Sequence, residues 1–412
     1  MRIHGAMIEA VARSDYRGVS VKQVIALAGV SRRSFYEQFE NKQDCFLATF
    51  DLIAQREVER IRESYRVTRG GIDERLLAVF GSFVDAASAE PNAPALVMVD
   101  AQTAGVAGTL RLRRATGACE EMLSLSFAHS SSATALPAPI VRAITGGLHG
   151  AVATRLRRGL TAGDTGRMAE EMLTWTLASR AVDGELLARH LLDGMRRRSR
   201  EIAFAERKRA RGQGPPQAHA EKDERVRLMR SVLRLVSGSG YDELTAPQIA
   251  DEARLSIDVF FEHFADRDEC FLAALQLIGD ELLSAVADPS LRSGEWPLAV
   301  RRSLSELLGL IGGRPRYARA LIHDSCSARP DTFEWSLTLA QSLAEALVAG
   351  APEPPAPLIV EAIAGAIWHT IRCQVAGGRI ALLPAVSDYL SYVVLGACIG
   401  APAAAEALHA DI

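Results

Sequence analysis

An internal repeat constrains this chain more than any other feature of its sequence. The segment from Tyr16, YRGVSVKQVIALAGVSRRSFYEQFENKQDCFLATFDLI, aligns without a gap with YDELTAPQIADEARLSIDVFFEHFADRDECFLAALQLI from Tyr241, at an offset of 225 residues. A second similarity links IVRAITGG from Ile140 with IVEAIAGA from Ile359, at an offset of 219 residues. Because the similarity recurs at the start and at the end of a unit of about 200 residues, the 412-residue chain is a duplication.

Composition predicts an all-α fold. Apolar residues make up 48% of the chain and charged residues 24%, as in ordinary globular proteins. Alanine, leucine and arginine recur while β-branched runs are short, which favours helices. The net charge of -3 excludes a globally basic protein, so any binding of nucleic acid must rest on a local patch.

Cysteine usage and the absence of known catalytic motifs narrow the function further. The six cysteines show neither CxxC pairs nor the spacing of metal ligands, so we expect buried free thiols, no metal and no cofactor. The sequence contains no GxSxG, HExxH, P-loop or dinucleotide-binding glycine motif, so we do not expect an enzyme.

The chain lacks the pattern of a secreted or membrane protein. Glu9 and Asp15 interrupt the N-terminal segment, which has no continuous apolar run of the kind found in signal peptides. The least charged stretch, Tyr389–Ala405, contains Pro402 and is shorter than the roughly 20 residues of a membrane span. We therefore expect a cytoplasmic protein without a membrane partner, which also fits free thiols.

The two units are joined by a connector. Gly212-Gln213-Gly214-Pro215-Pro216 breaks any helix, and Glu185–Arg211 before it has helical composition. The expected domains are a first helix-turn-helix domain at 1–55 (motif 20–39), a first helical ligand-binding and dimerisation domain at 56–183, a basic connector at 184–222, a second helix-turn-helix domain at 223–280 (motif 245–264) and a second helical domain at 281–412.

Helix start signals occur at matching places in the two repeats. In the first they are Ser20 with Gln23, Ser31, and Asn41 with Asp44; in the second they are Thr245 with Gln248, Ser256, and Asp266 with Glu269. Two helices joined by the tight Ala28-Gly29-Val30 turn are typical of a helix-turn-helix motif.

The spacing of phenylalanines predicts which face of the second motif helix is exposed. In a helix over Ser31–Phe39, Phe35 and Phe39 lie four residues apart and would pack inward with Val30. Arg32, Arg33 and Tyr36 would then lie on the opposite side. Arginine can bridge guanine edges, and Lys42 in the first turn of the next helix could hold a phosphate. Taken alone, a helix with two arginines is more often an ordinary solvated surface.

The whole pattern is more specific than its parts. The run Ser20–Phe39, followed by Asn41 and Lys42, resembles the TetR-family signature, in which AGVS leads into FYxxF and then an xKxxxF segment. The resemblance implies, in each unit, a three-helix DNA-binding part and a larger helical part that binds a ligand and dimerises. It makes DNA-contact candidates of Ser20, Lys22, Ser31, Arg32, Arg33, Ser34, Tyr36 and Lys42 in the first unit, and of Thr245, Ser256 and Arg267 in the second.

The second unit departs from this pattern. Ile257, Asp258, Val259 and Phe261 stand where the first unit has Arg32, Arg33, Ser34 and Tyr36. Residues 1–53 carry a net charge of +1, whereas the matching residues 226–278 carry -4. We expect the second motif to bind DNA weakly or differently. The eight basic residues of Arg196–Arg211 could compensate by contacting phosphates, although a solvated helix surface explains them equally well.

The resemblance also implies how the protein works. The last two helices of each unit would form a four-helix bundle, so the halves would form an intrachain pseudo-dimer that binds an operator with unlike half-sites. A small-molecule effector would release a repressor of this kind from DNA. The alternative is a ligand sensor or protein-interaction module that has lost DNA binding in one or both halves.

The ligand site stays unknown at this point. Apolar and aromatic lining candidates, none of them assigned as a site, are Phe80, Phe83, Met98, Met122, Phe127, His149, His323, Trp335, Trp368 and His369.

Overall fold

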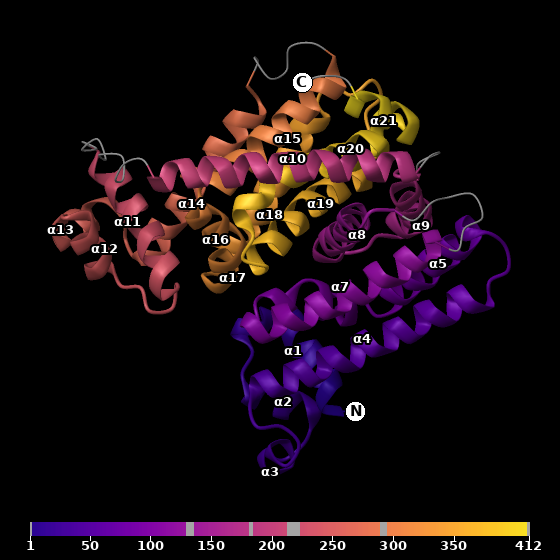
Figure 1. Ribbon diagram of the computed structural model, residues 1–412. Coiled ribbons are helices and arrows are strands. Elements are labelled where there is room, and N and C mark those ends of the chain that lie inside the picture. The colour runs from indigo at the N-terminus through magenta and orange to yellow at the C-terminus, as the bar shows by residue number, and fades with distance from the viewer. Residues whose placement is uncertain (1, 129–135, 181–183, 212–222, 289–294, 410–412) are drawn as a thin grey trace. The chain divides into compact units, whose positions relative to one another are not determined.

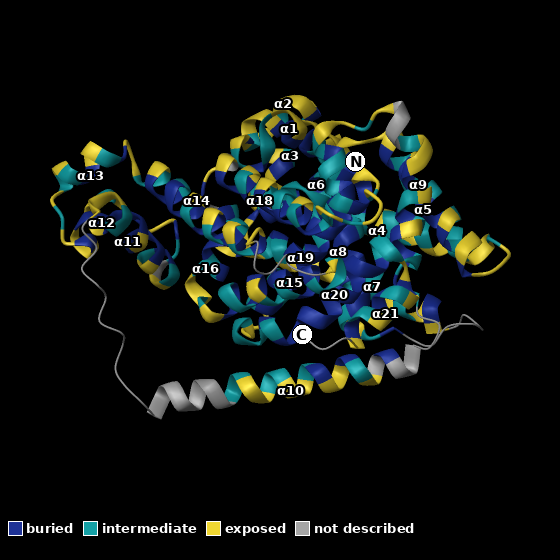
Figure 2. Cartoon of the chain, turned by 90° about the horizontal axis from the view of Figure 1, so that it is seen from above, coloured by how far each residue is buried: buried dark blue, intermediate teal, exposed yellow. Residues whose placement is uncertain are grey.

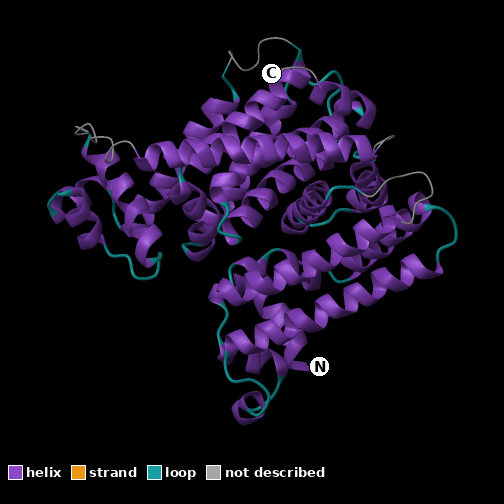
Figure 3. Cartoon of the chain, in the orientation of Figure 1, coloured by secondary structure: helices purple, strands orange, loops and turns teal. Residues whose placement is uncertain are grey.

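The computed structural model describes every residue except 1, 129–135, 181–183, 212–222, 289–294 and 410–412. Throughout the described residues the secondary structure is helical, with no strand, which confirms the all-α prediction (Figure 3). The predicted linker from Gly212 to Pro216 lies outside the described residues. The chain divides into two compact units, residues 1–182 with 356–366, and residues 183–355 with 367–412.

The first unit holds the helices of the first repeat (Figure 1). In chain order they are α1 (Arg2–Gly18), α2 (Val21–Ala28), α3 (Arg32–Tyr36), α4 (Lys42–Val67), α5 (Ile72–Ala89), α6 (Asn92–Met98), the short η1 (Asp100–Gln102), α7 (Gly105–Ala128), α8 (Ala138–Arg158) and α9 (Ala162–Leu177).

The second unit holds most of the remaining helices. They are α10 (Gly184–Arg211), α11 (Glu224–Ser239), α12 (Ala246–Ala253), α13 (Ile257–His263), α14 (Arg267–Val286), α15 (Trp296–Gly313), α16 (Pro315–Arg319), η2 (Ala320–Asp324), α17 (Ser325–Ser327), α18 (Pro330–Val348), α19 (Pro357–Ala376), η3 (Ile380–Val386), α20 (Ser387–Ile399) and α21 (Ala401–His409). Helix α19 is shared, because Ala356–Ala366 groups with the first unit.

Helix α10 confirms the helix predicted over Glu185–Arg211. It packs against η3 and α20 of its own unit. The guanidinium of Arg198 donates to Asp388 Oδ1 at 3.1 Å and to the hydroxyl of Ser387. These two bonds hold the middle of α10 against α20.

The first three helices and the start of α4 share one core with α6, η1 and the start of α7. Phe35 and Phe46 are completely buried, and the ring of Tyr16 lies 4.5 Å from that of Phe46. Helix α4 begins in this core and is 26 residues long in all, about 39 Å at 1.5 Å per residue. Its last turns therefore lie beside α5 and α7, far from the helix-turn-helix motif.

Helices α8 and α9 meet at a glycine. The buried indole of Trp175 donates from Nε1 to the carbonyl of Ile144 at 2.9 Å, and this bond holds the ring across α8. A Cβ on Gly147 would lie only 2.3 Å from Cζ2 of that ring. Gly147 is therefore needed for the close packing of this helix pair.

One apolar stretch within the described residues, Ile380–Ile399, is long and apolar enough by composition to cross a membrane. In this fold 72% of its most apolar window is buried inside the protein, as in a core helix of a folded domain.

We predict that Gly147→Ala lowers the thermal unfolding midpoint, because the added methyl group overlaps an indole that its hydrogen bond holds in place. Overpacking of this kind costs about 1–3 kcal/mol. The matched control is Gly81→Ala in α5, where nothing lies within 4 Å of the new Cβ. The control should leave the midpoint unchanged or raise it, since alanine is the better helix former. Equal midpoints for both variants in differential scanning calorimetry would contradict the packing argument.

Candidate nucleic-acid interface

The helix-turn-helix of the first unit is held by side-chain caps. Ser20 and Gln23 form a reciprocal capping box at the start of α2, with Gln23 N donating to Ser20 Oγ at 3.3 Å and Ser20 N to Gln23 Oε1 at 2.7 Å. Gly29 ends α2 in the left-handed conformation, at φ 61°. Ser31 caps α3 by accepting from Ser34 N at 3.0 Å. These caps confirm the predicted helix starts.

Helix α3 is shorter than predicted. The helix expected over Ser31–Phe39 ends at Tyr36, and Phe39 follows in a turn whose N–H donates to the carbonyl of Phe35 at 2.9 Å. Both residues are nevertheless buried: Phe35 is completely buried, and Phe39 is 8% exposed. The inward packing was predicted correctly, although the length of the helix was wrong.

The opposite side of α3 is exposed. The ring of Tyr36 is 45% exposed, and the guanidinium of Arg32 lies 5.6 Å from its centroid. Arg33 pairs with Glu37 at 2.9 Å, yet its side chain is 89% exposed. Since exposed pairs contribute about 0–1 kcal/mol, a phosphate or base can displace Glu37 at little cost. The face thus offers two guanidinium groups and one phenol.

The remaining first-unit candidates lie around this face. Lys22 is exposed on α2, with Ser20 at the start of that helix. The hydroxyl of Ser20 donates to Gln23 Oε1 at 2.9 Å, and the hydroxyls of Ser31 and Ser34 lie 2.9 Å apart. The serines therefore serve the helix caps.

Lys42 forms a clasp within the domain. Its Nζ donates to the carbonyls of Tyr16 at 3.0 Å and Arg17 at 3.4 Å, and it lies 4.4 Å from the centroid of the Tyr16 ring. Partial burial lowers the pKa of Lys42, and the nearby Asp15 carboxylate opposes that shift. An ammonium has three donors, so at most one N–H remains for a phosphate. Sequence reasoning missed this clasp.

The second unit repeats the scaffold. Thr245 and Gln248 form the capping box of α12, and Ser256 caps α13 by accepting from Val259 N at 3.3 Å. Phe260 and Phe264 are buried as Phe35 and Phe39 are. The turn after α12 differs, because Arg254 adopts the left-handed conformation at φ 56° where the first unit has glycine.

Arg267 repeats the clasp with a guanidinium. Its Nη1 donates to the carbonyls of Tyr241 at 3.5 Å, Asp242 at 3.3 Å and Leu244. The Cζ of the guanidinium lies 5.0 Å from the centroid of the Tyr241 ring. A cation at this place in both repeats therefore has a structural reason, namely the backbone carbonyls at the end of the first helix of the first domain and just after the first helix of the second. One feature of the sequence pointed to this clasp. A cation occupies the matching position in both repeats, although Arg32 and Arg33 have no basic counterpart in the second.

The exposed surface of the second motif has different chemistry. The ring of Phe261, which replaces Tyr36, is 56% exposed, and Asp258 and Glu262 are exposed beside it on α13. Figure 2 shows exposed residues on α13. Asp251 adds another exposed carboxylate from α12. None of these three carboxylates forms an ion pair with another described residue. The face is acidic and apolar where the first is basic.

The basic arm of α10 is described only in part. Arg196, Arg197 and Arg200 are exposed, while Arg198 is held by Asp388. The side chains of residues 204–211 lie outside the described ones. Among the described residues, no group of three or more histidine, cysteine, aspartate or glutamate side chains is placed to hold a metal ion.

Comparison with known families agrees with this geometry. The family model described as "Bacterial regulatory proteins, tetR family" matches the chain twice, at residues 6–49 and at residues 229–274. The two matches contain the helix-turn-helix motifs of the two units together with the clasp residues Lys42 and Arg267. No curated protein matches the chain.

Several solved structures resemble part of the chain. The transcriptional regulator FadR from Bacillus subtilis, in complex with stearoyl-CoA, is 17% identical over 45% of this chain and 98% of its own, with a TM-score of 0.39. A transcriptional regulator from Rhodococcus sp. Rha1 is 21% identical over 42% of this chain and 97% of its own, with a TM-score of 0.35. The TetR family regulator PfmR from Thermus thermophilus is 17% identical over 44% of this chain and 98% of its own, with a TM-score of 0.34.

We predict that Lys42→Met lowers the thermal midpoint of the DNA-free protein, because the carbonyls of Tyr16 and Arg17 lose their donor. The free energy of unfolding should fall by about 1–3 kcal/mol. Lys42→Arg should restore most of it, since Arg267 makes the same kind of contacts in the second unit. Calorimetry without DNA and fluorescence anisotropy with DNA separate the two roles of this side chain. An unchanged midpoint with weaker DNA binding would make Lys42 a phosphate contact rather than a clasp.

Proposed function

We propose that this chain, which belongs to the TetR family of bacterial regulatory proteins and carries the family's N-terminal domain twice, is a cytoplasmic transcriptional regulator that reads its operator mainly through α3. One observation carries the proposal. Arg32, Arg33 and Tyr36 are exposed together on a helix whose other side is anchored by the buried ring of Phe35. Arginine in the major groove forms bidentate bonds to guanine, and Tyr36 can contact the adjacent backbone.

Electrostatics make the two halves unequal DNA binders. Arg17, Lys22, Arg32 and Arg33 of the first domain are replaced in the second by Asp242, Pro247, Ile257 and Asp258. Each lost cation removes one released counterion from the binding equilibrium, and each carboxylate adds repulsion from phosphates. Thr245, Ser256 and Arg267 remain candidates for weaker backbone contacts. The proposed operator is therefore asymmetric, with one half-site read closely and the other touched weakly.

The pseudo-dimer is part of the same proposal. Within the first compact unit, α8 of the first repeat packs against the segment Ala356–Ala366 of the second repeat. A Cβ on Gly150 would lie 2.5 Å from the Cα of Gly365, so two glycines allow the backbones to approach closely. The buried carboxylate of Glu361 accepts from Arg155 at 2.8 Å and from Arg158 at 3.1 Å. These contacts support a bundle built from both repeats, with the domain boundaries expected from the sequence.

Release by an effector is supported by the course of α4. This helix begins with the Lys42 clasp and ends beside α5 and α7. Two further contacts tie its first half to the start of α7: Gln43 Nε2 donates to the carbonyl of Ala104 at 3.1 Å, and Arg111 pairs with Asp51 at 3.0 Å. A ligand that separates α4 from α7 would therefore tilt α4, and with it the helix-turn-helix domain that contains α3. We propose a repressor that such a ligand releases from DNA.

A second candidate function rests on the second motif. The exposed ring of Phe261, with Asp258 and Glu262 beside it, would suit the surface of an interaction module better than a DNA-binding helix. If both halves acted in this way, the chain would be a ligand sensor that controls another protein. The basic face of α3 favours the first candidate.

The predicted asymmetry can be measured with charge changes at matched positions. Arg33→Asp should weaken binding to a selected operator at least a hundredfold, because it replaces a base contact with repulsion. Asp258→Ala occupies the same place in the second repeat and should leave binding unchanged or strengthen it. An operator is obtained by selecting bound sequences from a random DNA pool, and affinities by fluorescence anisotropy at fixed salt. Equal losses in both variants would contradict unequal halves.

The pseudo-dimer predicts the stoichiometry on DNA. One chain should bind one operator at all protein concentrations, because its two halves are already joined. Sedimentation of the complex with labelled operator measures this directly. A complex that contains two chains, and whose formation depends on the square of protein concentration, would show that pairing occurs between chains instead.

A further inference from the structure

The exposed faces of α3 and α13 carry opposite charges on the same scaffold. On α13, Asp258, Phe261 and Glu262 lie at positions i, i+3 and i+4, so they share one side of the helix. On α3, Arg33 and Tyr36 occupy the positions that match Asp258 and Phe261. One chain therefore displays a basic motif helix and an acidic one, which we call the basic face and the acidic face.

Each face has an exposed aromatic ring. Tyr36 is 45% exposed and Phe261 is 56% exposed, and they are the two most exposed aromatic residues in the described part of the chain. They stand at matching positions of the two repeats. Aromatic and arginine residues are enriched at the centres of protein interfaces, where they contribute most of the binding energy. An exposed ring flanked by charges is thus suited to contact with another protein surface.

The charges of both faces are available for a partner. Neither Asp258 nor Glu262 forms an ion pair with another described residue, and the opposing charge is Arg254 at the turn before α13. On α3, Arg33 pairs only with Glu37, and both side chains are exposed. Because such exposed pairs contribute about 0–1 kcal/mol, Arg33 can exchange Glu37 for another carboxylate at little cost.

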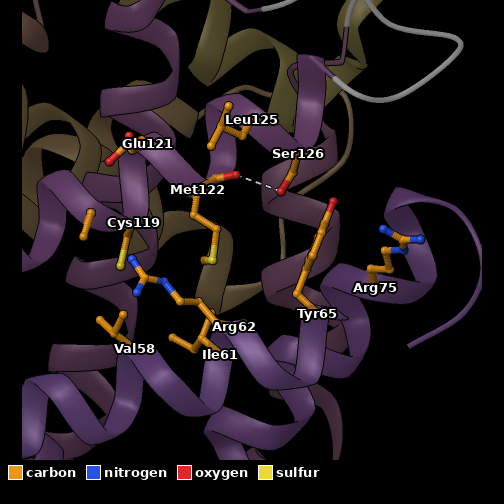
Figure 4. Close-up of a pocket in the computed structure, with 11 residues that line it drawn as sticks. Val58, Ile61, Arg62, Tyr65, Arg75, Cys119, Glu121, Met122, Leu125 and Ser126 are labelled. Carbon is orange, nitrogen blue, oxygen red and sulfur yellow. Dashed lines mark hydrogen bonds between the residues drawn. The ribbon is translucent and has the colours of Figure 1, made fainter. Parts of the chain in front are cut away.

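The other exposed apolar side chains have a different setting. Leu125, which is 52% exposed, lines a pocket of about 520 Å³ that α4, α5 and α7 form within the first unit (Figure 4). Met122, one of the lining candidates named from the sequence, lines the same pocket. The remaining exposed apolar side chains are aliphatic. Within the described residues, only α3 and α13 combine a strongly exposed aromatic ring with exposed charges of one predominant sign.

We propose that the acidic face of α13 docks on the basic face of α3 in a second copy of this chain. The two arginines of α3 pair with Asp258 and Glu262, while the ring of Phe261 packs against that of Tyr36. Guanidinium and carboxylate groups form bidentate, charge-assisted hydrogen bonds, and a guanidinium also packs favourably over an aromatic ring. Charge complementarity selects this occupant, and both faces are present in every copy at equal concentration.

Docking of this kind competes with an operator for α3. Carboxylates and an aromatic ring offer the arginines the same kinds of contact as phosphates and bases do. The two helices have only five and seven residues, so they bury much less than the roughly 1,600 Å² of a stable complex. The association is therefore weak, and an operator in excess displaces it. The proposal goes beyond the regulatory function and does not depend on it, because it needs only the two faces.

The test is sedimentation velocity of the full chain without DNA. At about 50 mM salt the sedimentation coefficient should rise with protein concentration, and at about 500 mM it should stay that of one chain, because salt screens exposed charges. Arg32→Gln/Arg33→Gln and Asp258→Asn/Glu262→Gln should each remain single chains at low salt. An equimolar mixture of the two variants should associate again, since each retains the face that the other lacks. That complex should stop at one chain of each variant.

Two control variants change the net charge by the same amount outside the two faces. Arg113→Gln/Arg114→Gln removes two exposed arginines of α7, and Asp280→Asn/Glu306→Gln removes exposed carboxylates of α14 and α15. Both should associate as the wild type does. Phe261→Ala removes a ring that is largely exposed, so the thermal midpoint should be unchanged while association weakens at least threefold.

Several results would overturn the proposal: a wild type that stays a single chain at every concentration, face variants that still associate alone, or a mixture that does not associate. Operator binding is measured separately. If the mixed variants associate while no operator can be selected, the regulatory function fails and the docking stands. If an operator is selected while the free chain never associates, the docking fails alone. With both in place, excess operator should return the associated wild type to one chain per operator.

Discussion

Helix α3 has five residues, far too few to persist by backbone hydrogen bonds alone. Its position depends on the burial of Phe35, whose ring is completely enclosed, and on the cap that Ser31 provides at its start. The exposed face of α3 follows from this anchor, because Arg32, Arg33 and Tyr36 are exposed only while Phe35 faces inward. The caps of α2 and the Lys42 clasp add to the anchor by fixing the two helices and the loop that surround it.

The two repeats show that this scaffold and its surface evolve separately. Caps, buried phenylalanines and a clasping cation occur in both domains, while the exposed residues change from basic to acidic and apolar. The scaffold residues interact with one another, so changing one leaves a buried group without its partner. The surface residues interact with solvent or a ligand, and they can change without a cost to folding. A fold of this kind therefore says little about whether a given copy binds DNA, and the chemistry of its exposed residues says much more.

The sequence predicted the helix caps and the inward packing of Phe35 because these depend on residues close together in the chain. It predicted the duplication because the two repeats align directly, and its composition predicted the helical fold. It gave the wrong end for α3, since Phe39 is buried from a turn and four-residue spacing alone cannot distinguish a turn from a further helical residue. The clasp was missed because the acceptors of Lys42 are backbone carbonyls 26 and 25 residues earlier.

The left-handed turn at Arg254 affects how the second domain is maintained. A residue with a Cβ loses about 1 kcal/mol in this conformation, and glycine at the same place in the first domain does not. The guanidinium of Arg227, on α11, donates to the carbonyls of Ala253 and of Arg254, at 2.6 Å and 3.3 Å. It thus stabilises the strained turn that follows α12. Besides the backbone bonds that Arg254 N and Leu255 N donate, this one side chain therefore stabilises a strained loop. Heat or mutation would be expected to open that loop while the phenylalanine core beneath it is still intact.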